Sequence, residues 1–151
     1  MKIAIACDHA GFSLKQHLSK YLKEQGHEVV DLGVDTDAVP TDYPDAAKKL
    51  GDAVVNGVAE RGILSCGSGV GASIAANKIK GVYCGLCHDA YSAAQGVRHD
   101  NMNVLALGGR VIGVALAEAL VDAFLAEQFD TETERYGRRF NLLKAIESAA
   151  E

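Results

Sequence analysis

Five short apolar runs alternate with amphipathic stretches along this chain, and this alternation constrains the fold more than any other feature. The apolar runs are typical of β-strands and cover residues 2–7, 28–32, 62–65, 82–86 and 104–107. The other stretches have the spacing of helices and cover residues 13–25, 43–56, 70–77, 90–97, 114–124 and about 133–149. No hairpin signal separates two of the runs, so the strands are expected to pair in parallel through right-handed helical crossovers.

This pattern predicts an α/β fold, a single doubly wound, Rossmann-like sheet of five parallel strands with helices on both faces. The runs are apolar throughout, as expected of strands that are buried on both faces. No linker interrupts the 151 residues, and 48% hydrophobic against 23% charged residues is typical of one compact domain, here residues 1–151. So short a sheet does not need the last helix for coverage, so we expect an extra C-terminal helix that contacts a partner.

Charge and hydropathy limit the partners of the chain. Fifteen Lys and Arg against 20 Asp and Glu give a net charge of −5, so no general positive field attracts nucleic acid or anionic lipid. The longest apolar run near the start, residues 3–7, is shorter than the core of a signal sequence, about 7–15 residues, or a membrane span of about 20. We therefore expect a cytoplasmic protein that binds neither nucleic acid nor membrane, and any phosphate site has to be local.

Reactive side chains and glycines gather where the expected strands end. In a doubly wound sheet, ligands bind beyond the carboxyl ends of the strands, so the site is expected where these segments meet. The segments are Cys7-Asp8-His9-Ala10-Gly11, Cys66-Gly67-Ser68-Gly69-Val70-Gly71, Cys87-His88-Asp89 and Gly108-Gly109-Arg110.

The four cysteines, Cys7, Cys66, Cys84 and Cys87, are expected to be free thiols, because a chain without an export signal resides in a reducing compartment. The segment from Cys84 to His88 also matches the C-x-x-C-H pattern of haem attachment, and its two cysteines could form a redox pair or half a zinc site. Haem attachment usually accompanies export, and a second pair of zinc ligands is missing. We therefore interpret Cys84 and Cys87 as small buried strand residues, and no metal site is predicted.

The glycine loop between a strand and a helix predicts an anion site. Its backbone can turn tightly and present N–H groups to a phosphate or an oxyanion. Gly67, Gly69 and Ala72 also satisfy the G-x-G-x-x-G/A fingerprint of dinucleotide binding, with Asp89 about 20 residues on. Against that alternative, the loop follows the third strand rather than the first, and no second domain remains to hold a substrate.

Cys66 lies at the start of this loop, where a helix N-terminus favours the thiolate. A cysteine phosphatase would need an arginine at the position of Ala72, and a G-x-S-x-G nucleophile elbow centred on Ser68 would need glycines where Cys66 and Val70 stand. A thiolate beside backbone donors suits proton abstraction next to a carbonyl, in which the donors stabilise an enediolate. The alternative, a purely structural cysteine, remains open on these local features.

The motifs together resemble those of the B-type ribose-5-phosphate isomerases, which are grouped with the galactose-6-phosphate isomerase subunits. The resemblance covers essentially the whole chain, through the first strand end, Thr41-Asp42-Tyr43-Pro44, residues 66–78 and residues 103–111. It implies interconversion of ribose 5-phosphate and ribulose 5-phosphate through an enediolate, a pentose phosphate pathway reaction of carbohydrate metabolism, without metal or organic cofactor.

The resemblance also implies roles for individual residues. Cys66 matches the base that moves the proton between two carbons, and Ser68 matches a Thr or Ser that assists proton transfer between the oxygens. His99 matches the residue that assists opening of the furanose ring. The resemblance also implies that the backbone amides of the glycine loop hold the oxyanion. The substrate-binding residues that it implies are Asp8, His9, Tyr43, Gly67, Ser68, Gly69, Val70, Gly71, Asp100, Arg110, Arg135 and Arg139.

Three positions distinguish this chain within the family that it resembles. Some relatives use a Glu base at the position of Ala72 and lack the cysteine, so this chain resembles the thiol users. Asp100 stands where many relatives have Asn, and Tyr136 stands where many have His.

The resemblance further implies a two-fold homodimer, with a tetramer left open, in which Arg135 and Arg139 of one chain reach the site that holds Cys66 of the other. Arg135 and Arg139 are four residues apart and would share one helix face, although Gly137 between them favours a later helix start.

On local features alone, His9 is equally well explained as a loop-capping residue and His99 as a surface residue. We interpret His17, His27 and His88 as structural or solvated.

Three classes of function therefore compete. The first is an aldose–ketose isomerase for a pentose phosphate, or for a six-carbon phosphosugar such as allose or galactose 6-phosphate. The second is a nucleotide-dependent oxidoreductase, and the third is a binding module that takes up a phosphosugar without changing it.

Overall fold

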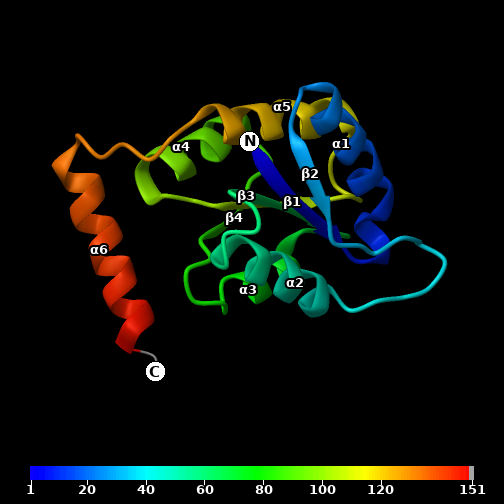
Figure 1. Cartoon of the computed structure of the whole chain (residues 1–151), viewed down its shortest axis with the longest axis horizontal. Helices are drawn as coiled ribbons and strands as arrows, with labels where there is room; N and C mark the ends of the chain where they lie inside the picture. Colours follow the sequence, from blue (N-terminus) through cyan, green and yellow to red (C-terminus); the bar gives the residue numbers. More distant parts are fainter. Residues whose placement is uncertain (150–151) are drawn as a thin grey trace.

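Five parallel strands form one sheet in the order β2-β1-β3-β5-β4 in the computed structural model, which describes residues 1–149 (Figure 1). The strands are β1 (Lys2–Cys7), β2 (Glu28–Asp31), β3 (Arg61–Cys66), β4 (Cys84–Leu86) and β5 (Val104–Gly108). The strand order reverses between β1 and β3, so their carboxyl ends flank the point where a doubly wound sheet binds ligands. The predicted five-stranded, doubly wound parallel sheet is confirmed.

Helices cover both faces of the sheet, as predicted. A 3₁₀ turn (His9–Gly11) follows β1, and the α-helices are α1 (Phe12–Glu24), α2 (Tyr43–Val55), α3 (Val70–Ala76), α4 (Ala90–Asp100), α5 (Val114–Ala126) and α6 (Glu134–Ala149). Alternate residues of β1 enter two separate cores: Ile3 and Ile5 pack with α1, α4 and α5, whereas Ala4 and Ala6 pack with α2 and α3. Cys66 belongs to the second core, so its side chain lies on the α2 and α3 face.

Most boundaries differ from the prediction by one or two residues, and hydrogen bonds and backbone conformation explain the differences at β4 and α4. Strand β4 begins at Cys84 instead of residue 82, because the N–H of Val82 donates to the Ile79 carbonyl and that of Tyr83 to the Asn103 side chain. Helix α4 extends to Asp100, beyond the expected end at residue 97, and Asn101 ends it in the left-handed conformation, at a φ of 55°. The residues predicted to act at positions 99 and 100 therefore lie in the last turn of a helix.

Cys84 and Cys87 lie in different cores. Cys87 packs in the core that contains α4 and α5, and Cys84 packs against the core of α2 and α3. Residues three apart in an extended segment point to opposite faces, so these thiols are not a C-x-x-C pair. The interpretation as small buried strand residues is correct only in part, because Cys84 is a half-buried residue of β4 and Cys87 is buried just beyond the end of that strand.

Helix α6 stands apart from the layers at one end of the molecule (Figure 1). It continues through Gly137, so the expectation that Gly137 would delay the helix start is wrong; a glycine in an exposed helix costs only about 1 kcal/mol. Of the sixteen residues of α6, all of them described, Tyr136 alone is buried.

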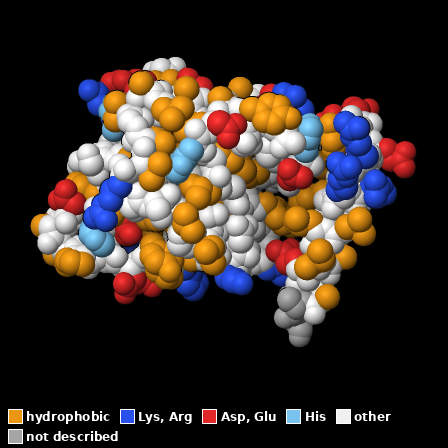
Figure 2. Space-filling view, turned by 180° about the vertical axis from the view of Figure 1, so that it is seen from behind, with side chains coloured by type: hydrophobic (Ala, Val, Ile, Leu, Met, Phe, Trp, Pro, Cys, Tyr) orange, Lys and Arg blue, Asp and Glu red, His pale blue; other side chains and the backbone are white. Residues whose placement is uncertain are grey.

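A groove separates α6 from the rest of the chain, and hydrophobic side chains line it together with polar and charged ones (Figure 2). The helix is attached near both ends of the groove: the Phe140 ring meets Tyr83 edge-on at 5.0 Å between centroids, and a Glu147 carboxylate oxygen accepts from the Gly81 N–H at 2.7 Å. Leu143 and Ile146 on the groove side of α6 remain exposed. Between residues 1 and 149, no helix combines the length and the apolar character that a membrane span requires.

Candidate active site

A hollow of about 440 Å³ opens at the carboxyl ends of β1, β3 and β5, where the sequence predicts the site. Cys66 ends β3 and is 4% exposed. The hollow gathers predicted site residues from four separate segments of the chain. Its walls are Asp8, His9, Ala10, Tyr43, Cys66, Gly67, Ser68, Gly71, Arg110 and Val111.

The glycine loop holds the Cys66 thiol beside a backbone donor. The N–H of Gly69 donates to the Cys66 sulfur at 3.0 Å, and the N–H of Val70 donates to the Ser68 hydroxyl oxygen at 3.2 Å. Gly69 has a φ of 81°, a left-handed conformation that a residue with a side chain rarely adopts. Two of the five amides expected to hold an oxyanion therefore already have partners within the loop.

Tyr43 and Arg110 lie against the two ends of this loop. Tyr43 begins α2, and its ring lies so close to Gly71 that a Cβ added there would be 2.7 Å from the ring. A Cβ added to Gly67 would be 3.6 Å from the Arg110 guanidinium. Gly71 thus makes room for the Tyr43 ring, whereas a side chain at Gly67 would be in ordinary van der Waals contact with Arg110.

Asp8 and His9 are fixed by bonds to the backbone. An Asp8 carboxylate oxygen accepts from the Gly11 N–H at 3.0 Å, which caps the 3₁₀ turn. The N–H of His9 donates to the Thr41 hydroxyl at 3.0 Å, and the N–H of Thr41 donates to His9 Nδ1 at 3.1 Å. His9 Nδ1 also lies 3.2 Å from the Thr41 carbonyl oxygen, so the backbone of Thr41 holds this side of the imidazole ring.

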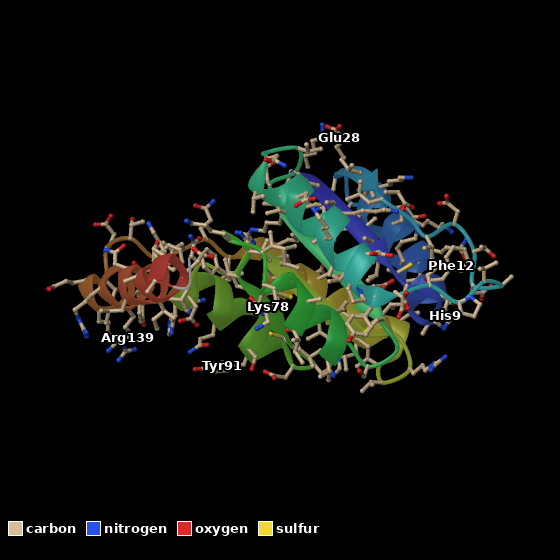
Figure 3. All side chains as sticks on the ribbon, turned by 90° about the horizontal axis from the view of Figure 1, so that it is seen from below. His9, Phe12, Glu28, Lys78, Tyr91 and Arg139 are labelled. Carbon is tan, nitrogen blue, oxygen red and sulfur yellow. The ribbon has the colours of Figure 1, made fainter. Side chains whose placement is uncertain are left out.

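The other predicted site residues, His99, Asp100, Arg135 and Arg139, do not line this hollow. Arg139 on α6 and His9 lie at opposite ends of the molecule in Figure 3. His99 and Asp100 end α4, which starts beyond the carboxyl end of β4 and extends 11 residues, or about 16 Å, back along the sheet. At that end the Glu127 carboxylate pairs with Arg98. The Glu127 backbone carbonyl accepts a hydrogen bond from the side chain of Arg61, the first residue of β3. Within one chain, His99 therefore lies toward the start of β3 and Cys66 at its end.

His99 and the arginines form a second group of their own. The His99 ring stacks on Tyr136 at 4.0 Å between centroids, and Arg135 donates to the Tyr136 hydroxyl at 2.9 Å. Arg135 and Arg139 are both exposed on α6, one helical turn apart. The chain thus carries two incomplete sets of predicted site residues at its two ends.

The other three thiols, Cys7, Cys84 and Cys87, lie outside the walls of the hollow. Burial raises the pKa of Cys7 to about 11 and that of Cys84 to about 12, and burial also raises the pKa of Cys87. These three thiols are therefore protonated at neutral pH. Among residues 1–149, no group of three or more His, Cys, Asp or Glu side chains is arranged to hold a metal ion.

Sequence reasoning missed three residues that support the predicted site. Thr41 belongs to the Thr41–Pro44 motif, and its hydroxyl holds the His9 N–H from 32 residues away. His88, interpreted as structural or solvated, accepts from the Gly108 N–H at 3.1 Å, just before the turn that carries Arg110. Its position at the end of β4, next to the end of β5, was the one available signal. Tyr136, a departure from many relatives, contacts both His99 and Arg135.

Comparison with known proteins agrees with the site geometry. The family model Ribose/Galactose Isomerase matches residues 3–143. Ribose-5-phosphate isomerase B of Escherichia coli is 45% identical over 146 residues, covering 97% of this chain and 96% of its own. A galactose-6-phosphate isomerase subunit of Clostridium acetobutylicum is 38% identical over 151 residues, covering 100% of this chain and 84% of its own. The structure of Clostridium thermocellum ribose-5-phosphate isomerase B superimposes with a TM-score of 0.95 at 40% identity, covering 100% of both chains.

A five-stranded parallel sheet that carries a glycine loop and a thiol at its switch point thus defines, with these similarities, a cofactor-independent isomerase. The chain belongs to the ribose/galactose isomerase family.

Proposed function

We propose that this enzyme interconverts D-ribose 5-phosphate and D-ribulose 5-phosphate through an enediolate, with Cys66 as the base. The observation that carries the proposal is the Cys66 sulfur in the wall of the hollow, hydrogen-bonded to the Gly69 amide. A thiolate held there can take a proton from a carbon next to a carbonyl. The E. coli and C. thermocellum relatives, both named ribose-5-phosphate isomerase B, support the choice of substrate.

The proposed reaction moves two protons and needs no redox partner. The Cys66 thiolate takes the proton from C2 of the open-chain aldose, and the electron pair forms the C1–C2 double bond of the enediolate. Ser68 assists transfer of the O2 proton to O1, and the thiol then returns its proton to C1, which gives the ketose. Loop N–H groups stabilise the oxygen charge of the intermediate.

Ala72 supports the thiol as the base. Its side chain is a methyl group, fully buried in the same core as Cys66. The position at which some relatives have a Glu base therefore offers no carboxylate. Neither Asp8, which caps the 3₁₀ turn, nor any other carboxylate in the wall of the hollow replaces it among the described residues. Cys66 is therefore the acid–base group that the glycine loop itself provides, which supports its proposed role.

We also propose that the active form is a two-fold homodimer in which each site combines both sets of residues. His99, Asp100, Arg135 and Arg139 of one chain would complete the hollow that holds Cys66 of the other. Leu142, Leu143 and Ile146 of α6 are 58%, 44% and 74% exposed, an apolar surface suited to a second copy of the chain.

The free thiols support a reducing compartment, and hence the expected cytoplasmic location.

A six-carbon phosphosugar such as galactose or allose 6-phosphate is the second candidate substrate. The observation that favours it is the similarity to the galactose-6-phosphate isomerase subunit, which covers the whole of this chain. The two candidates need the same proton transfers and differ only in the length of the sugar between phosphate and carbonyl.

Incubation of EDTA-treated protein with ribose 5-phosphate is expected to produce a ketose, because the proposed chemistry uses side chains alone. The measurement is ketose formation, with galactose 6-phosphate and allose 6-phosphate in parallel. Greater kcat/KM for a hexose phosphate would transfer the proposal to that substrate. Binding of ribose 5-phosphate without turnover would indicate a binding module, and saturable binding of NAD would support the oxidoreductase alternative.

His99→Ala is expected to lower kcat/KM for ribose 5-phosphate by about tenfold or more, because His99 is proposed to assist ring opening. Erythrose 4-phosphate supplies the matched comparison, since its phosphorylated C4 oxygen cannot close a five-membered ring. Any turnover of this tetrose phosphate should change less than about threefold. His17→Ala, a change of the α1 imidazole that pairs with Glu118, is the control and should leave both rates unchanged. Equal losses on the two sugars would argue against the ring-opening role.

A further inference from the structure

Tyr136 lies between two side chains that the proposed function gives different tasks. It is 7% exposed and is the one buried side chain of α6 within the described chain. The His99 ring lies on its face at 4.0 Å, with only 18° between the ring planes. On the same phenol, the Arg135 guanidinium lies 4.9 Å from the ring centre and donates to the hydroxyl at 2.9 Å.

The stack restrains a ring that would otherwise be free to rotate. His99 comes in the last turn of α4, and its backbone is held on both sides: Asn101 ends the helix, and the Asp130 N–H donates to the Arg98 carbonyl at 3.0 Å. The backbone bonds fix where the imidazole starts, and the phenol face fixes the plane in which it lies.

The hydroxyl restrains Arg135, a long and exposed side chain with many rotamers. One Nη2 proton is used on the Tyr136 oxygen, which leaves the other guanidinium N–H groups free for an anion. A cation that is already positioned loses less conformational entropy when it binds a phosphate.

We infer that Tyr136 is a positioning residue that holds the ring-opening imidazole and a phosphate-binding guanidinium in one fixed arrangement. This inference rests on the proposed function for what the two side chains do. The two contacts are separable, because the ring face serves His99 and the hydroxyl serves Arg135. Each can therefore be removed by a different substitution.

Two substitutions test the two contacts with ribose 5-phosphate as substrate. Tyr136→Phe keeps the ring and removes the hydroxyl, so KM should rise by about tenfold, the effect of one hydrogen bond to a charged group, while kcat stays within about twofold. Tyr136→Leu removes both contacts, so KM should rise similarly and kcat should also fall, by about five- to tenfold. Compared with Tyr136→Leu, Tyr136→Phe should therefore have the kcat of the wild type but a KM that is still raised.

Phe140→Leu is the matched control, because Phe140 attaches α6 to Tyr83 without contacting His99. A role in α6 attachment alone would make Phe140→Leu and Tyr136→Leu alike in KM and kcat, and would leave Tyr136→Phe close to wild type. Either result overturns the inference.

Nuclear magnetic resonance of the histidine rings tests the stack without turnover. The His99 ring protons, assigned with His99→Gln, should be shifted upfield in the wild type and in Tyr136→Phe, and should move downfield in Tyr136→Leu. An unmoved signal in Tyr136→Leu overturns the inference. Lack of isomerase activity in the wild type would count against the proposed function, while the imidazole shift would still decide whether Tyr136 orients His99.

Discussion

Replacing Cys66 with alanine is expected to abolish isomerisation while binding of the phosphosugar survives. Loss of a general base costs ~10²–10⁴-fold in rate, and the buried methyl group of Ala72 offers no replacement. Binding should persist because Asp8, His9 and Arg110 line the hollow independently of the sulfur. The measurements are kcat for ribose 5-phosphate and, separately, the dissociation constant of the inactive variant for the same sugar.

Cys84→Ala is the matched control, because it removes a half-buried thiol of the edge strand that lies outside the hollow. Its kcat should stay within about twofold of the wild type, as expected of a group that takes no part in proton transfer. Near-normal turnover by Cys66→Ala would contradict the thiol mechanism. A variant that neither turns over nor binds would point instead to a structural role for Cys66.

Alkylation provides a second test of the same thiol. At pH 8 only about one in a thousand Cys7 side chains is a thiolate, since its pKa is raised to about 11, and Cys84 is protonated still more completely. Burial raises the pKa of Cys87 too, whereas Cys66 lines the hollow and its sulfur accepts from the Gly69 N–H. We expect iodoacetamide to modify Cys66 first, with loss of activity in proportion, and ribose 5-phosphate to slow the reaction. Mapping the modified peptide by mass spectrometry shows which thiol reacted.

The features predicted correctly from sequence depend on local order along the chain. Apolar runs of four to six residues give the strands, and their ends identify Cys66, Asp8 and Arg110 as neighbours once the sheet is parallel. Tyr43 could be placed too, because it stands before Pro44 at a helix start. These predictions needed only the period of the pattern and the rule for where parallel strands end.

The features missed from sequence depend on contacts between distant segments. The hydrogen bonds of Thr41 with His9, and of His88 with Gly108, leave no periodic signal. The spacing of residues in α6 predicts a helix but not the position of that helix. In the structure α6 stands away from the sheet and places Arg139 at the far end of the molecule (Figure 3). The resemblance implies that Arg135 and Arg139 act at the partner's site, and the structure adds that His99 and Asp100 lie at the same end of the chain as these arginines, away from Cys66.

That separation leads to the strongest test of the proposed dimer. Cys66→Ala and Arg139→Ala proteins should each be nearly inactive, and mixing them under conditions of subunit exchange should restore about a quarter of wild-type activity. With equal amounts, half of the dimers are mixed, and each mixed dimer has one site with both an intact Cys66 and an intact Arg139. Its other site carries both substitutions and stays inactive. Size-exclusion chromatography and native mass spectrometry would establish that exchange has occurred.

The reverse mixture distinguishes a shared site from one built within a single chain. Wild-type protein mixed with an equal amount of the Cys66→Ala/Arg139→Ala double variant starts at about half of full activity. If each site takes Cys66 and Arg139 from different chains, every mixed dimer is inactive and exchange lowers the activity to about a quarter. If both residues act within one chain, each mixed dimer keeps one good site and the activity stays at about half. That second outcome would require Arg139 to reach Cys66 within its own chain, across the length of the molecule that Figure 3 shows between α6 and His9.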